Sequence, residues 1–141
     1  MIRIATIEDA EQLYVLNENF NGKGETTLEN IKYAILNNHQ EVIIVAEENQ
    51  TLIGFVCVQL KKSFCYHNYQ AEITEVYIEP MYRRKKVASK MICFAEQYCM
   101  QHYRLHKFEI LTGRHNLGAQ ALYSSLGYSN DGELHLTKRM T

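Results

Sequence analysis

The sequence contains a single proline, and no apolar run in it is long enough to cross a membrane. No stretch rich in Ser, Gly and Pro offers a linker between domains, and no internal repeat is present. The first 13 residues also lack the apolar core of a signal peptide. These absences predict one domain over residues 1–141 of a soluble, cytoplasmic protein.

The cysteines and histidines are not arranged as metal ligands. Cys57, Cys65, Cys93 and Cys99 contain no C-x-x-C pair, and the six histidines form no H-x-H or H-E-x-x-H pattern. The cysteines do not resemble a disulfide framework either. We therefore expect no metal site, and we expect Cys57 and Cys93 to be buried because both lie in apolar stretches.

The charge that is present is spread unevenly along a chain of net charge −1. Residues 1–79 contain 5 basic and 12 acidic side chains, whereas residues 80–141 contain 10 basic and 4 acidic ones. Chance could produce this split. It would also arise if a basic site for an anion lay beside an acidic site for a cation.

Hydrophobic periodicity and capping residues predict the order β-α-α-β-β-β-α-β-α-β. The expected strands are residues 1–6, 41–48, 51–62, 71–79, 107–112 and 132–140, and the expected helices are residues 6–20, 26–38, 84–103 and 117–128. Hairpins come first and a strand–helix–strand unit comes later. This predicts an α/β fold of the mixed α+β kind, with a central, mostly antiparallel sheet flanked by helices on both faces.

Four consecutive basic residues, numbers 83–86, lie where a strand that stops at Pro80 leads into the long helix. The first N–H groups of a helix have no intrahelical partner and its dipole is positive there, so an anion is favoured at this place. A compact polyphosphate fits such a short run better than a nucleic acid does, and the net charge also argues against nucleic acid. The alternative is a solvated basic face.

Two segments resemble the GNAT superfamily of N-acetyltransferases. The first is "PMYRRKKVA" at residues 80–88, where Arg83 and Ala88 match the family's Arg/Gln-x-x-Gly-x-Gly/Ala turn. The second is "NLGAQALYSSLGY", which begins at Asn116 and places Tyr123 in a short helix. The order of elements is similar along essentially the whole chain. The resemblance implies an acetyl-CoA-dependent enzyme whose residues 83–88 hold the pyrophosphate of the co-substrate.

The resemblance also implies which residues bind acetyl-CoA. Backbone contacts are expected from Val76, Tyr77 and Ile78, and further contacts from Arg83, Arg84, Lys85, Lys86, Val87, Ala88, Ser89, Asn116 and Tyr123. Lys86 departs from the pattern because it replaces the first glycine of the turn. A lysine fits there only if the backbone is ordinary, so we expect an ordinary conformation with binding retained.

Acetyl transfer to an amine requires a proton acceptor for the amine and benefits from a proton donor for the leaving thiolate. Glu72 and Glu75 are the candidate bases, and they should face opposite sides of the sheet unless a bulge intervenes. The resemblance favours Glu72, although a water chain can serve instead. Tyr123 is the candidate acid, and core packing is the alternative for it.

The sequence thus predicts an N-acetyltransferase that transfers acetyl directly to a primary amine. Acidic residues near the first helix break, Glu18, Glu25 and Glu29, would suit a small cationic acceptor such as an aminoglycoside, a polyamine or an amino-acid-like amine. A non-catalytic acyl-CoA-binding or regulatory module and a protein N-acetyltransferase are the alternatives. No nucleic-acid or membrane partner is expected, and a homodimer would be in keeping with similar proteins.

Overall fold

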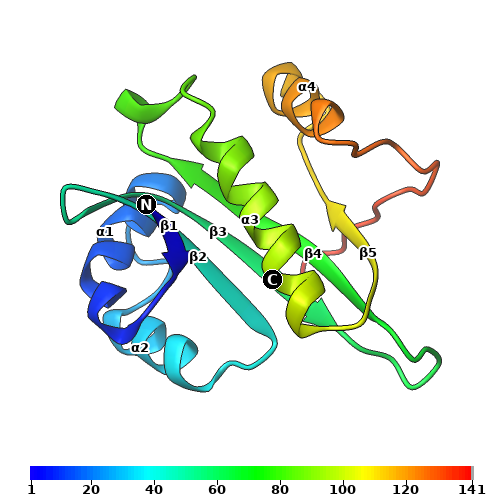
Figure 1. Cartoon of the computed structure of the whole chain (residues 1–141), viewed down its shortest axis with the longest axis horizontal. Coiled ribbons are helices and arrows are strands. Elements are labelled where there is room, and N and C mark those ends of the chain that lie inside the picture. The colour runs from blue at the N-terminus through cyan, green and yellow to red at the C-terminus, as the bar shows by residue number, and fades with distance from the viewer. Residues whose placement is uncertain (141) are drawn as a thin grey trace. The chain divides into compact units, whose positions relative to one another are not determined.

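The computed structural model describes residues 1–140. They form two compact units, one over Met1–Leu111 and one that begins at Thr112. The first unit contains all five strands and three of the α-helices (Figure 1). Its elements are β1 (Ile2–Ile4), η1 (Ile7–Asp9), α1 (Ala10–Asn21), α2 (Leu28–Asn37), β2 (Glu41–Glu48), β3 (Thr51–Lys61), β4 (Tyr69–Ile78), η2 (Pro80–Tyr82), α3 (Val87–His102) and β5 (Leu105–Ile110).

The strands form one sheet in the order β1-β2-β3-β4-β5. The strands β1 to β4 pair antiparallel with one another, and β5 runs parallel to β4. A parallel pair needs a crossover connection, which α3 provides. The expected mixed, mostly antiparallel sheet is therefore confirmed.

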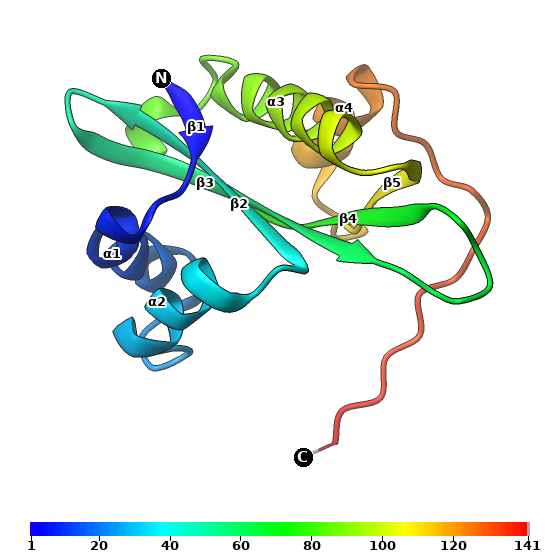
Figure 2. The ribbon, with the colours of Figure 1, turned by 60° about the horizontal axis from the view of Figure 1, so that its bottom comes forward.

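Helices cover both faces of this sheet (Figure 2). The helix α3 packs on one face through its buried residues Met91, Ile92, Ala95 and Cys99. The helix α1 buries Leu13 and Leu16 on the other face, against Val45, Phe55 and Tyr77. Cys93, which was expected to be buried, is exposed. That prediction was wrong because only the i, i+4 stripe of α3 meets the sheet.

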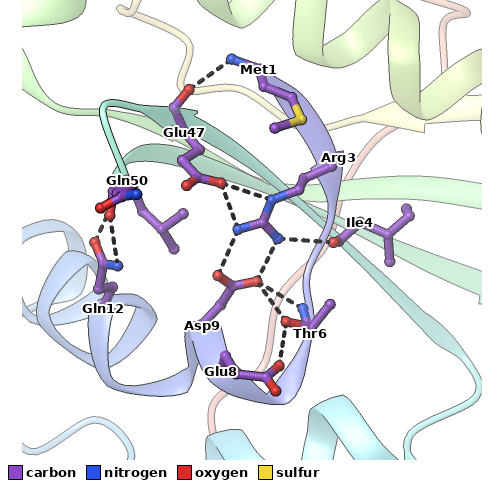
Figure 3. Close-up of polar contacts among 10 residues, drawn as sticks. Met1, Arg3, Ile4, Thr6, Glu8, Asp9, Gln12, Glu47 and Gln50 are labelled. Atoms are coloured by element: carbon purple, nitrogen blue, oxygen red, sulfur yellow. Dashed lines mark hydrogen bonds and ion pairs between the residues drawn. The ribbon is translucent and has the colours of Figure 1, made fainter.

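Arg3 on β1 joins the first helical turn to β2 (Figure 3). Its guanidinium donates to both carboxylate oxygens of Asp9, at 2.7 and 2.9 Å, and forms an ion pair with Glu47 at 2.9 Å. Asp9 also accepts the backbone N–H of Thr6 at 2.8 Å. These bonds hold the pKa of the buried Asp9 carboxyl below its usual value, chiefly through Arg3. The network ties the start of α1, and with it the helical cover of the sheet, to the sheet itself.

The second unit contains one helix, α4 (Leu117–Ser125). Asn116 caps it by accepting the N–H of Ala119 at 3.1 Å, and Gly127 follows its end with φ of 98°. This is the expected glycine role just beyond a helix. The strand expected at residues 132–140 is not formed: this stretch has neither helix nor strand, and its leucines are exposed. Alternation gave the segment a strand pattern, but a strand also needs a hydrogen-bonded neighbour.

Candidate active site

The strand β4 is paired along only half of its length on the side of β5. In the described chain that ladder covers residues 69–73 of β4, so residues 74–78 have an open edge there. The backbone N–H of Glu79, just after β4, donates to the backbone carbonyl of Ile53 on β3 at 2.8 Å. Because backbone groups alternate between the two edges of a strand, Tyr77 also faces β3, whereas Val76 and Ile78 face the open edge. Of the three expected backbone contacts, two are thus directed to this edge.

Arg83 anchors the basic turn to the end of β4. Its Nε donates to the backbone carbonyl of Ile78 at 2.7 Å, and its guanidinium lies 5.7 Å from the centre of the Tyr77 ring. Arg83 therefore occupies the Ile78 carbonyl, which is one of the hydrogen-bond acceptors on the open edge of β4. Arg84, Lys85 and Lys86, all exposed, present the remaining positive charge to solvent.

The backbone of the turn is left-handed at two of these residues. Arg84 has φ of 62°, and Lys86 has φ of 64° with ψ of 18°. The expectation of an ordinary conformation at Lys86 was therefore wrong. A lysine here adopts the path that glycine would adopt freely, at a cost of about 1–2 kcal/mol. The turn thus keeps the backbone course of a glycine turn without the glycine.

The helix α3 begins at Val87, three residues later than expected, since the left-handed Lys86 stops it from starting earlier. The first N–H of α3 to bond a turn carbonyl is that of Lys90, which donates to Lys86 at 3.1 Å. The preceding N–H groups, those of Val87, Ala88 and Ser89, lie in the first turn, where helices have no internal acceptors. Together with three exposed cationic side chains, they make this helix start suitable for an anion.

A β-bulge places the two candidate bases on the same face of the sheet. Cys57 of β3 pairs with Glu75, whereas the next residue of β3, Val58, pairs with Ile73, so Thr74 is an extra residue in β4. One inserted residue reverses the alternation beyond it. The expectation that Glu72 and Glu75 face opposite sides was therefore wrong, and both lie on the face covered by α1.

The two glutamates nevertheless have different surroundings. Glu72 forms an ion pair with Lys61 at 2.5 Å. Glu75 is half-buried, and among the described residues it has neither an ion pair nor a hydrogen bond to its carboxylate. Burial raises the pKa of the Glu75 carboxyl. A raised pKa makes a carboxylate a better proton acceptor near neutral pH.

Glu41 on β2 is a neighbour of this pair that sequence reasoning missed. It lies in one cross-strand row with Gln59 and Glu72, and the adjacent row holds Cys57 and Glu75. Burial, and to a lesser extent the charge of Glu75, raises the pKa of Glu41. Its place depends on the register of two hairpins and on the bulge. From the sequence, only the strict alternation of side chains along each strand could have indicated that Glu41 and Glu75 share a face. That alternation is interrupted at Thr74 by the bulge.

The remaining predicted residues, Asn116 and Tyr123, belong to the second unit. Burial raises the pKa of the half-buried Tyr123 phenol, whose ring lies 6.5 Å from that of Tyr128. Within the described residues, no group of three or more His, Cys, Asp or Glu side chains could hold a metal. No helix of residues 1–140 has the length and apolar character needed to span a membrane.

Comparison with known proteins agrees with this geometry. Residues 7–128 match the model of the acetyltransferase (GNAT) family. An uncharacterized N-acetyltransferase of Bacillus subtilis, YhfO, is 31% identical over 100 residues, which cover 70% of this chain and 65% of that protein.

Two solved structures share the fold at low sequence identity. An aminoglycoside acetyltransferase from a soil metagenome, solved with trehalose, aligns with a TM-score of 0.85 at 14% identity, covering 100% of this chain and 96% of that one. The enzyme AAC(6')-Iy with the bisubstrate analog CoA-S-monomethyl-acetylneamine aligns with a TM-score of 0.86 at 15% identity, covering 100% and 98%. By its match to the family model over residues 7–128, the chain belongs to the GNAT acetyltransferase family.

Proposed function

We propose that the protein is an acetyl-CoA-dependent N-acetyltransferase that transfers the acetyl group directly to a small cationic primary amine. One observation carries this proposal: the open edge of β4 places Val76 directly after the half-buried Glu75 and leads, through Arg83, into a cationic helix start. A proton acceptor, an edge that can bind an extended acyl carrier and an anion site thus follow one another along β4 and the turn after it. We infer that residues 1–141 act together as one acetyltransferase domain.

The open edge suits the amide-containing arm of acetyl-CoA. The backbone groups of Val76 and the N–H of Ile78 can pair with such an arm as a neighbouring strand would. An N–H there can donate to the thioester carbonyl oxygen, which gains negative charge as the amine attacks. The pyrophosphate would then lie at residues 83–89, where first-turn N–H groups and Arg84, Lys85 and Lys86 offer donors and charge.

Glu75 is the better supported base of the two glutamates. The acceptor ammonium must give up a proton before its nitrogen lone pair can attack the thioester carbon. Lys61 neutralises Glu72, whereas Glu75 is free of protein cations in the described chain. We therefore infer that Glu75 takes the proton. The role of Glu72 would be its ion pair with Lys61 on the same face of the sheet.

Tyr123 is retained as the donor that protonates the thiolate as the carbon–sulfur bond breaks. Replacing Tyr123 with Phe removes only the hydroxyl, so we expect kcat to fall by roughly ten- to a thousand-fold. CoA affinity and the melting temperature should stay close to the wild-type values. Steady-state kinetics with parallel calorimetry would measure both, and an unchanged kcat would leave Tyr123 with a packing role only.

An amine panel, followed by release of free thiol from acetyl-CoA, tests the proposed function. The panel should contain polyamines, aminoglycosides, amino-acid amides and a peptide with a free N-terminus. We expect turnover with small polycationic amines and less with the peptide. Tight CoA binding without turnover on any acceptor would instead support a non-catalytic acyl-CoA-binding module, and preferred turnover of the peptide would support a protein N-acetyltransferase.

A homodimer is a further part of the proposal. The exposed leucines at residues 134 and 136 give the C-terminal stretch a strand-like alternation. Sedimentation of the purified protein over a range of concentrations would determine the oligomeric state.

A further inference from the structure

Two carboxylates from different strands converge on the face of the sheet that α1 covers. Glu41 comes from β2 and Glu75 from β4, on either side of β3. Between them β3 presents Cys57 and Gln59.

Glu41 has neutral partners only. Its Oε2 accepts a hydrogen bond from the Gln59 amide at 3.3 Å, and the Cys57 thiol lies within hydrogen-bonding reach of its carboxylate. No ion pair to Glu41 or Glu75 is formed within residues 1–140. Lys61 and Lys107 lie on this face, and they form ion pairs with Glu72 and Glu109 respectively. Among residues 1–140, Glu41 and Glu75 therefore have no counter-ion, whereas Glu72 and Glu109 on the same face each have one.

Keeping two partly buried carboxylates close together without a cation is unfavourable. The cost can be relieved by protonation or by a cation that comes from outside the protein. The position of the two carboxylates favours an external cation over protonation. Glu75 directly precedes Val76, whose backbone faces the open edge where the acyl group would lie, so the carboxylates adjoin the place of reaction rather than an isolated surface.

We propose that Glu41 is a specificity-determining residue of the acceptor site and that it binds a second cationic group of the acceptor. This inference rests on the proposed function. Glu75 faces the amine that reacts, and Glu41, one strand beyond β3, faces an ammonium further along the same molecule. The preferred acceptors are therefore diamines and larger polycations rather than amines with one positive charge.

A matched pair of acceptors tests this inference. Putrescine and n-butylamine have the same carbon chain and differ by the second ammonium group. Binding of each to the protein saturated with CoA, which cannot transfer an acetyl group, is measured by calorimetry for the wild type and for Glu41→Gln. We expect Glu41→Gln to weaken putrescine binding by roughly ten-fold or more and butylamine binding by less than two-fold.

Glu48→Gln is the matched control, because Glu48 is an exposed residue at the end of the same strand and the substitution removes the same charge. It should change neither affinity. If Glu41→Gln impairs folding, Glu41→Asp keeps the charge on a shorter side chain, and it should shift the preference among diamines of different length while retaining the preference for two charges. Equal losses for the two amines in Glu41→Gln, or no preference for putrescine in the wild type, would overturn the inference.

The calorimetric test separates this inference from the proposed function, because it needs no turnover. Acetylation of amines without any preference for a second charge would overturn the role of Glu41 and leave the transferase proposal intact. Selective dication binding that depends on Glu41 supports the inference even where no acetyl transfer follows.

Discussion

At the scale of single residues, partners decide the function of each carboxylate more than its place in the sequence. Glu72 and Glu75 are three residues apart and share a face, yet one is bound to Lys61 and the other has no cationic partner among the described residues. A general base must be free to accept a proton. The ion pair therefore distinguishes the two side chains and supports Glu75 as the base, whereas the family resemblance favoured Glu72.

Replacing Glu75 with Gln should lower kcat/KM by roughly a hundred-fold or more, since it removes the proton acceptor while keeping the size of the side chain. The raised pKa of Glu75 means that wild-type activity grows as the pH rises through that value. We expect Glu75→Gln to lack this rise and to recover partly at high pH, where more of the amine is already neutral. A pH–rate profile over the acceptor amine measures both effects.

Glu72→Gln is the comparison for this experiment. It should lose little in rate, because Glu72 is already neutralised by Lys61. A rate loss that high pH rescues in Glu72→Gln, together with an active Glu75→Gln variant, would reverse the assignment. If neither variant shows such a loss, the proton leaves through water.

Lys86 is a second residue whose conformation matters more than its chemical type. Because its φ of 64° is strained for a lysine and free for glycine, Lys86→Gly should raise the free energy of unfolding by about 1 kcal/mol. Urea denaturation would measure this gain. CoA affinity should not increase, because the substitution keeps the backbone path and removes a charge. Tighter CoA binding by the glycine variant would mean that the lysine obstructs the phosphate site.

At the scale of elements, the junction between β4 and α3 joins the acyl site to the anion site. Arg83 ties the turn to β4, and the left-handed residues 84 and 86 bring the chain into the helix. The cationic side chains and the first N–H groups of α3 are therefore held close to the end of the open edge.

Replacing Arg84 and Lys85 together with Ala should weaken CoA binding by about 1–3 kcal/mol, the scale of lost charge-assisted hydrogen bonds. Both side chains are exposed, so the fold should be unaffected. Calorimetric titration with CoA at two salt concentrations measures the loss and its ionic character. The double variant Lys23→Ala with Lys32→Ala removes the same charge from exposed sites in another part of the chain, and should bind CoA normally. Equal affinity in both double variants would exclude the turn as the phosphate site.

At the scale of the whole molecule, the network around Arg3 links the first strand, the first helical turn and the second strand. The Asp9 pKa is lowered in the folded protein, so its stabilising effect is present above the unfolded-state pKa and is lost as the pH falls through the folded value. Asp9→Asn should therefore lower the free energy of unfolding by about 2 kcal/mol near neutral pH. The difference from wild type should shrink in acid.

Urea denaturation between about pH 7 and pH 3 would measure this dependence. Glu25→Gln, in an exposed loop, serves as the control and should leave stability almost unchanged. A difference between wild type and Asp9→Asn that stays constant down to low pH would mean that shape rather than charge accounts for the role of Asp9.

The sequence by itself determined the family, the order of elements from residue 1 to residue 125 and the position of the basic turn. These features depend on local signals: the period of apolar residues, the caps of helices, and short motifs around Arg83 and Asn116. Such signals act between residues a few positions apart, so they can be read without knowing which strands are neighbours. The predicted order of elements is confirmed for this reason, except for the last strand. Residues 132–140 alternate as a strand would, but no neighbouring strand pairs with them within residues 1–140.

Only the tertiary structure decided which side chains meet. The extra residue Thr74 reverses the facing of Glu75, and no pattern within β4 announces it, because a bulge is defined by the partner strand. The pairing of Lys61 with Glu72 and the approach of Glu41 to Glu75 depend in the same way on the register of three strands. Chemistry at this site is set by distances between residues remote in sequence, and those distances exist only once the sheet has formed.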